Sequence, residues 1–215
     1  MSPRMRAFLG QVIAVTFALV LGAIVILLID ESPVRVFTTL LRGAFGDTTR
    51  IAGTLLQTTP ILISGVAACI ALRGGMFNVG VEGQLFMGGF AAALIGFAFP
   101  LPPGIHMLAG LVAAVCAGAA WVAIPAWFRV RFNANEVVST ILSNYVAVLL
   151  TSYFTIFLFK RPGGWSETPP VLPSAYLPEL FDFSRLNWGL VIGLALALEV
   201  QSVLREDLRL LIMSA

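Results

Sequence analysis

Long apolar stretches, separated by short polar segments, dominate this chain of 215 residues. A helix needs about 20 apolar residues to cross a hydrocarbon layer roughly 30 Å thick, and the apolar stretches recur at close to that length. The pattern predicts an all-α polytopic transmembrane helical bundle of about six spans, with residues 1–215 forming a single transmembrane domain. The predicted spans cover residues 8–29, 51–72, 85–99, 107–127, 137–159 and 186–204.

The composition agrees with a membrane protein and excludes an ordinary soluble domain. Hydrophobic residues make up 59% of the chain and charged residues only 11%, and the mean hydropathy is +0.95. A soluble domain carries about 25% charged residues. The 13 Lys and Arg residues are scattered and form no basic block, so we expect no nucleic-acid partner.

The placement of basic residues predicts the orientation. Arg4 and Arg6 precede a first apolar stretch that is longer than a signal-peptide core, so we predict an uncleaved span with a cytoplasmic N-terminus. Residues 73–84 and 128–136 are then also cytoplasmic, and the proline-rich residues 160–185 lie outside. This outer segment is either an ordered irregular cap or a flexible linker.

A glycine-rich segment, ALRGGMFNVGVEGQ at residues 71–84, separates the second and third apolar stretches. Its glycines, Gly83 among them, let the backbone leave the helix and turn back. Asn78, Glu82 and Gln84 then have room to point at a ligand, a neighbouring helix end or water. The alternative is a cytoplasmic turn with a helix cap and a solvated glutamate.

A polar stripe begins just before the fifth apolar stretch. Asn133 and Glu136 have the spacing of a capping box, which predicts a helix start. The stripe continues along one helical face at Glu136, Thr140, Asn144 and Thr151, over about 22 Å. Two interpretations stay open, an aqueous pathway or hydrogen bonds between helices.

Pro60 interrupts the second apolar stretch beside Gln57 and Thr59. A proline inside a helix removes one backbone hydrogen bond, so we predict a kink at which these polar side chains meet the freed carbonyl. Such a kink either opens space in the core of the bundle, or its polar side chains only satisfy the freed backbone groups of the same helix.

Small residues mark faces for close helix packing. Gly88 and Gly89 lie on the third predicted span, and Gly110, Ala114 and Gly118 recur every four residues on the fourth. In lipid, such faces let two helix backbones approach each other, so both spans are expected inside a tightly packed bundle.

Residues for catalysis or metal binding are missing from the sequence. It has no metalloprotease, serine-hydrolase or nucleotide-binding motif, so we predict no enzyme, no cofactor and no metal site. His106, the single histidine, is expected in a loop, and Cys69 and Cys116 are expected as unpaired thiols within apolar stretches.

Two strings carry a resemblance to a known family. GMFNVGVEGQ at residues 75–84 and NEVVSTILSNY at residues 135–145, in this order and separation, resemble the permease subunits of bacterial ABC importers for nucleosides and simple sugars. Their superfamily includes branched-chain amino-acid and ribose importers. The resemblance implies alternating-access transport across the inner membrane, with a second permease subunit as a homo- or heterodimer, ATPase subunits and an extracytoplasmic substrate-binding lipoprotein.

The resemblance also implies where the substrate pathway lies. Related permeases continue past the sixth span with an ATPase-docking segment that residues 199–215 do not resemble, so residues 1–215 are expected to be the N-terminal part of a longer permease. The alternatives are an ATP-independent channel or secondary carrier, or a branched-chain amino-acid permease. The predicted pathway or pathway-shaping residues are Asn78, Glu82, Gln84, Asn135, Glu136 and Asn144, with Thr140 added by the polar stripe.

Overall fold

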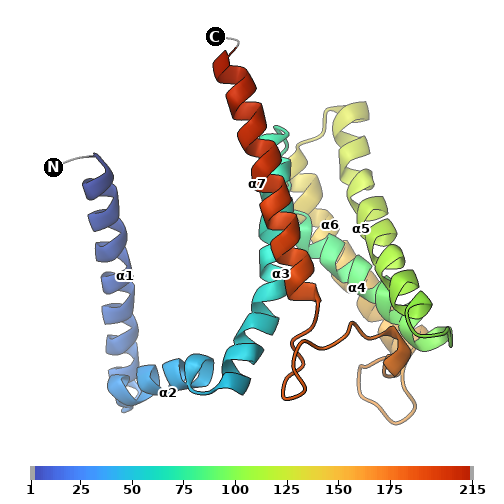
Figure 1. Cartoon of the computed structure of the whole chain (residues 1–215), viewed down its shortest axis with the longest axis horizontal. Helices are drawn as coiled ribbons and strands as arrows, with labels where there is room; N and C mark the ends of the chain where they lie inside the picture. The colour runs from blue at the N-terminus through green and yellow to red at the C-terminus, as the bar shows by residue number, and fades with distance from the viewer. Residues whose placement is uncertain (1–2, 214–215) are drawn as a thin grey trace.

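A computed structural model describes residues 3–213, and this part of the chain folds into seven α-helices joined by short connections (Figure 1). The helices are α1 Pro3–Leu28, α2 Pro33–Phe45, α3 Thr48–Arg73, α4 Val81–Ala98, α5 Ile105–Phe132, α6 Glu136–Tyr153 and α7 Gly189–Met213, with a π-helical turn η1 at Phe154–Leu158 and a 3₁₀ turn η2 at Pro173–Ala175. The predicted all-α transmembrane bundle is confirmed.

Five helices are long and apolar enough to cross a membrane, namely α1, α3, α4, α5 and α6 continued by η1. The chain is therefore a multi-pass membrane protein. The apolar part of α7, Gly189–Val203, is shorter than these five. It also starts three residues later than predicted, because Asn187 Oδ1 accepts a hydrogen bond of 2.9 Å from the backbone N–H of Gly189 and so sets the helix start.

Helix α2 was not predicted, because residues 30–50 fall between the first two predicted spans. Ser32 caps its start by accepting from the backbone N–H of Arg35, and Pro33 occupies the first turn, where its missing N–H costs nothing. The Ser-Pro pair was the available sequence signal. Helix α2 links α1 to α3, and α1 stands apart from the other long helices (Figure 1).

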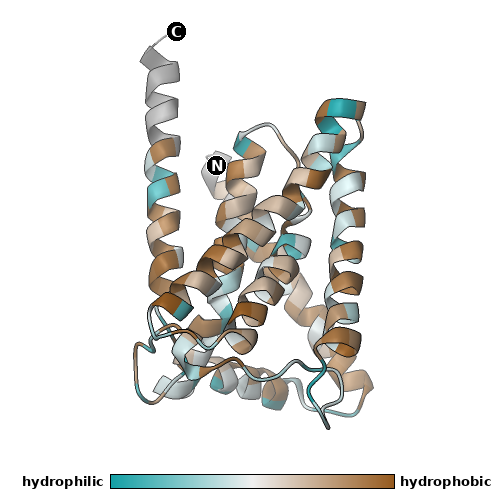
Figure 2. Ribbon diagram, turned by 90° about the vertical axis from the view of Figure 1, so that its right-hand side faces the viewer, coloured by the Kyte–Doolittle hydropathy of each residue, from teal (hydrophilic) through white to brown (hydrophobic). Residues whose placement is uncertain are grey.

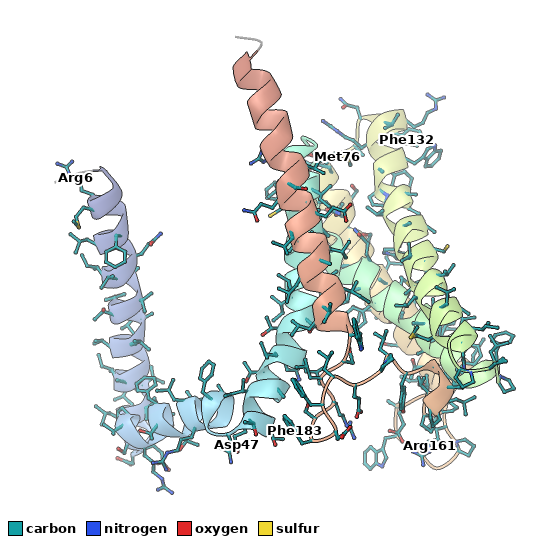
Figure 3. All side chains as sticks on the ribbon, viewed as in Figure 1. Arg6, Asp47, Met76, Phe132, Arg161 and Phe183 are labelled. Carbon is teal, nitrogen blue, oxygen red and sulfur yellow. The ribbon has the colours of Figure 1, made fainter. Side chains whose placement is uncertain are left out.

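The connections gather at two opposite ends of the bundle (Figure 3). We call the end that contains residues 74–80 and 133–135 the hinge end. Residues 160–188 form the cap, and we call the end at which they lie the cap end. The structure thus confirms that the segments predicted to share a side do so, while the side that faces the cytoplasm stays a prediction. Figure 3 labels Arg6, Met76 and Phe132 at the hinge end, and Asp47, Arg161 and Phe183 at the cap end.

Apolar residues predominate along the helices (Figure 2), and many of their large side chains are exposed. Large side chains such as Val115 and Leu149 are each 70% exposed, which suits contact with lipid tails. Small residues lie between the helices instead. This arrangement explains why the described residues contain few buried large hydrophobic side chains.

Helices α4 and α5 pack antiparallel through their predicted small faces. A Cβ atom placed on Gly88 would lie 3.0 Å from the carbonyl oxygen of Ala114, and one on Gly118 would lie 3.5 Å from that of Gln84. Gly110 makes a third, looser contact, with a carbonyl of α4 3.9 Å from its Cβ position. The prediction of close backbone packing is confirmed.

The cap is ordered, and it is tied to the ends of α4 and α5. The backbone N–H of Leu172 donates to the carbonyl of Gly96 over 2.9 Å. The prediction of a loop position for His106 is wrong, because this residue is fully buried in the first turn of α5. Its Nε2 donates to the carbonyl of Ile95 over 3.0 Å, and its Nδ1 lies 2.7 Å from Ser174 Oγ. These contacts replace the flexible-linker alternative.

Candidate functional site: a polar clamp at the hinge end

The glycine-rich segment ends α3, and α4 starts earlier than predicted. Gly75 ends α3 with φ of +74°, a conformation that glycine adopts at little cost. Helix α4 begins at Val81, four residues before the predicted start, so Glu82 and Gln84 lie in its first turn and not in a loop. Glu82 is exposed there, where a carboxylate interacts favourably with the helix dipole.

Two side chains of α6 bind the backbone of the glycine-rich segment. Glu136 Oε1 accepts from the N–H of Phe77 over 3.1 Å. One turn further along α6, Thr140 Oγ1 accepts from the N–H of Val79 over 3.3 Å. These two N–H groups lie in the turn between α3 and α4, outside any helix, and α6 supplies their acceptors.

Asn144 makes the third contact, and it is bidentate. Its Oδ1 accepts from the N–H of Gly83 over 2.9 Å, and its Nδ2 donates to the carbonyl of Val79 over 2.9 Å. Gly80, at the start of α4, has no side-chain cap of its own. Asn144 therefore satisfies one of the unpaired N–H groups of the first turn of α4 from a neighbouring helix. We call Glu136, Thr140 and Asn144 the clamp.

Gly83 is required by the closeness of this contact. A Cβ atom there would lie 2.9 Å from Asn144 Oδ1, 3.0 Å from Trp121 Nε1 and 3.1 Å from the Cα of Asn144. Gly83 was expected to let the chain leave a helix. It instead lies inside α4, where its lack of a side chain lets α5 and α6 approach.

The clamp identifies the polar stripe as a hydrogen-bonding surface between helices. Three of its four residues bind the glycine-rich segment. The fourth, Thr151, is buried and donates to the carbonyl of Ala147 in its own helix over 2.8 Å. Whether these side chains also border a substrate pathway stays a prediction.

The predicted capping box is wrong. Asn133 has φ of +50° and ends α5, and its Oδ1 accepts from Arg129 Nη1 over 3.1 Å. Asn135 caps α6 alone, with Oδ1 accepting from the N–H groups of Val137 and Val138. Asparagine tolerates the left-handed conformation, so a tight turn separates α5 from α6. The spacing of Asn133 and Glu136 matched a motif that this turn prevents.

An ion pair extends the clamp to α5. Arg129 Nε lies 3.7 Å from Glu136 Oε2, and the two side chains are 45% and 21% exposed. Glu136 thus links α5, α6 and the glycine-rich segment. Arg129 was not among the predicted site residues, although its place in the last turn of α5 was a signal, because a cation is favoured there.

Two buried donors next to the clamp have no acceptor among the described residues. They are Gln84 Nε2 and Trp121 Nε1. A buried N–H without a partner costs about 1–3 kcal/mol. Of the other predicted pathway residues, Asn78 is engaged within its own turn, where its Oδ1 accepts from the N–H of Gly80 over 2.8 Å.

Two cavities among the described residues lie at the cap end, away from the clamp. One of about 720 Å³ lies between α4, α5 and the cap, and one of about 600 Å³ lies between α4, α6 and the cap. No predicted pathway residue lines either of them.

Gln57 lines a shallower opening beside α2, and Thr59 donates to the carbonyl of Leu55 over 3.0 Å. Pro60 lies within α3, and its kink stays a prediction.

Comparison with known proteins gives one family and several relatives. Residues 50–206 match the family described as branched-chain amino acid transport system / permease component. The guanosine ABC transporter permease protein NupP of Bacillus subtilis is 33% identical over 96% of this chain and 60% of its own length. The glucose ABC transporter permease protein TsgB13 of Haloferax volcanii is 30% identical over 90% of this chain and 54% of its own length.

A third relative is more distant. The nucleoside ABC transporter permease protein NupB of Lactococcus lactis is 26% identical over 95% of this chain and 58% of its own length. The chain thus spans a little over half the length of each of these curated relatives. No solved structure matches the chain.

Proposed function

The chain belongs to the branched-chain amino acid transport system / permease component family, and we propose that it acts as a permease subunit of an ATP-driven importer that moves nucleosides or simple sugars across the inner membrane. One observation carries the proposal. The two strings that resemble nucleoside and sugar permeases, 75–84 and 135–145, are joined by the clamp, for example between Gly83 and Asn144.

The named relatives support the substrate class. NupP is named for guanosine, NupB for nucleosides and TsgB13 for glucose. All of these solutes are uncharged and rich in hydroxyl groups. Hydroxyl groups suit recognition by amides and carboxylates in a site that excludes water. The relatives favour an importer over an ATP-independent channel or secondary carrier.

ATP hydrolysis is assigned to a partner subunit. The proposed assembly contains ATPase subunits, an extracytoplasmic substrate-binding lipoprotein and a second permease subunit, either a copy of this chain or a sister permease. The hinge end faces the cytoplasm in this proposal, with Arg129 and Arg131 in the last turn of α5 on that side.

The clamp gives the transport cycle a mechanical basis. Alternating access needs elements that move as rigid units between inward- and outward-facing states. Because the clamp joins α6 to the start of α4, these two helices move together. Asn78 holds the turn of the glycine-rich segment, and Asn135 holds the start of α6. With the clamp, Glu82 and Gln84, they are the residues proposed to shape the pathway.

The proposal is tested by reconstitution with the proposed partners. Proteoliposomes would contain this chain, the ATPase, a second permease subunit and the binding protein loaded with guanosine. We expect the loaded binding protein to stimulate ATP hydrolysis, and binding protein loaded with leucine to have no effect. Stimulation only by binding protein loaded with leucine would instead identify the chain as a branched-chain amino-acid permease.

A further inference from the structure

The cavity of about 720 Å³ at the cap end has a floor made of small residues. Gly89, Ala92 and Ala93 of α4 and Gly110 of α5 line it. A Cβ atom built on Gly89 would meet nothing within 4 Å, so this part of α4 borders open space and not a neighbouring helix. The volume falls within the range of about 300–1,000 Å³ that is typical of small-molecule sites.

The opposite wall is a two-stranded ribbon within the cap. Glu179 and Asn187 form an isolated antiparallel bridge. The backbone N–H of Leu180 donates to the carbonyl of Leu186 over 2.7 Å, and Leu186 is 2% exposed. Side chains alternate between the two faces of such a ribbon, so the odd-numbered positions share the face opposite Leu186. The ribbon residues that line the cavity are Leu177, Glu179, Arg185 and Asn187.

This face carries two charged groups without partners in the described part of the chain. Neither the Glu179 carboxylate nor the Arg185 guanidinium takes part in a hydrogen bond or an ion pair there. Asn187 is already used, because it caps α7. Tyr176 adds an aromatic ring that also lines the cavity and is 58% exposed.

We propose that this cavity is the site at which the permease receives a nucleoside from the cap end, with Tyr176 stacked on the base, Glu179 accepting hydrogen bonds from ribose hydroxyl groups and Arg185 donating to base acceptors. The proposal rests on the proposed function and adds three recognition residues to it. A flat aromatic ring can stack on any of the nucleoside bases, and hydrogen bonds to the charged groups of Glu179 and Arg185 orient the ligand.

A thiol-protection experiment tests the site without requiring transport. In a background in which the exposed Cys69 and Cys116 are replaced by alanine, Ala175→Cys places a thiol on the cavity wall. The variant chain, in membranes with the cap end accessible, is labelled with an impermeant thiol reagent at increasing guanosine concentrations. We expect guanosine to slow the labelling, and Tyr176→Ala, Glu179→Gln and Arg185→Gln each to raise the half-protecting concentration about tenfold or more.

The matched control is Asp182→Asn. Asp182 is an exposed carboxylate of the same cap that does not line the cavity. Guanosine should therefore slow the labelling of this variant as much as it slows that of the parent. Equal protection in all variants, or no protection, overturns the site. Guanosine uptake that persists in that case leaves the proposed function standing. Protection by leucine and not by guanosine, without guanosine uptake, overturns the site and the function together.

Discussion

Asn144 of α6 holds Gly83 of α4 through a hydrogen bond of 2.9 Å from the glycine N–H to Oδ1. The same carboxamide donates to Val79, so one side chain satisfies a backbone donor and a backbone acceptor. In most proteins a residue just before the helix caps its start, but here the cap comes from another span. The start of α4 therefore depends on the position of α6.

Asn144→Ala should lower the stability of the folded chain by about 1–3 kcal/mol, because it leaves two backbone groups without partners. Thermal unfolding in detergent measures this loss. Tyr145→Phe is the control, since Tyr145 is 67% exposed on the same helix and outside the clamp. Equal unfolding temperatures for the two variants would mean that water replaces the clamp.

Gly83→Ala should destabilise the chain by about 1–3 kcal/mol, because the added methyl group meets the backbone of Asn144 at 3.1 Å. Gly65→Ala is the matched control, because a Cβ atom there meets nothing within 4 Å. At this second site alanine is expected to be neutral or to stabilise α3 by up to about 1 kcal/mol. The same detergent unfolding assay compares both variants, and a tolerated Gly83→Ala would contradict the close packing of α4 on α6.

Glu136→Gln should cost less stability than Glu136→Ala, because glutamine retains an acceptor for the N–H of Phe77 and loses only the ion pair with Arg129. A double-mutant cycle with Arg129→Ala isolates that ion pair. Since both side chains are partly exposed, we expect a coupling of only about 0.2–1 kcal/mol. A larger coupling energy would mean that Glu136 stabilises the chain mainly through its ion pair with Arg129.

His106→Ala should release the cap, because both ring nitrogens bridge α5 to neighbouring elements and the side chain is fully buried. Hydrogen exchange of the backbone N–H groups at residues 172–176 measures the release, and we expect faster exchange there than in the parent. Ser174→Ala should act in the same direction with a smaller effect, since it keeps the contact with Ile95. Unchanged exchange in both variants would contradict the role of His106 as an anchor.

The apolar pattern was sufficient to predict the bundle and the small faces of α4 and α5, because lipid imposes helix length and backbone packing on the sequence directly. It was not sufficient for α2, whose 13 residues are too few to span a membrane and lie between two predicted spans. The pattern also placed the start of α4 too late. The polar residues Glu82 and Gln84 suggested a loop, although an acidic first turn is favourable in a helix.

The partners of the polar residues could not be predicted, since they depend on contacts between distant segments. Glu136, Thr140 and Asn144 were grouped correctly by helical spacing, yet spacing cannot distinguish a water-filled face from one that binds a neighbouring backbone. The burial of His106 was hidden for the same reason, because Ser174 lies 68 residues away in the chain. The capping box failed because its local pattern competed with a tight turn at Asn133.

Uptake of labelled guanosine by cells tests the central claim most directly. The cells would produce this chain with its proposed ATPase, second permease subunit and binding protein, and the parent would be compared with Asn144→Ala and Tyr145→Phe at equal membrane levels. We predict ATP-dependent uptake by the parent and by Tyr145→Phe, and at least a several-fold loss in Asn144→Ala. Guanosine uptake that is absent from the parent, or that continues without ATP, would contradict the assignment of the chain to an ATP-driven nucleoside importer.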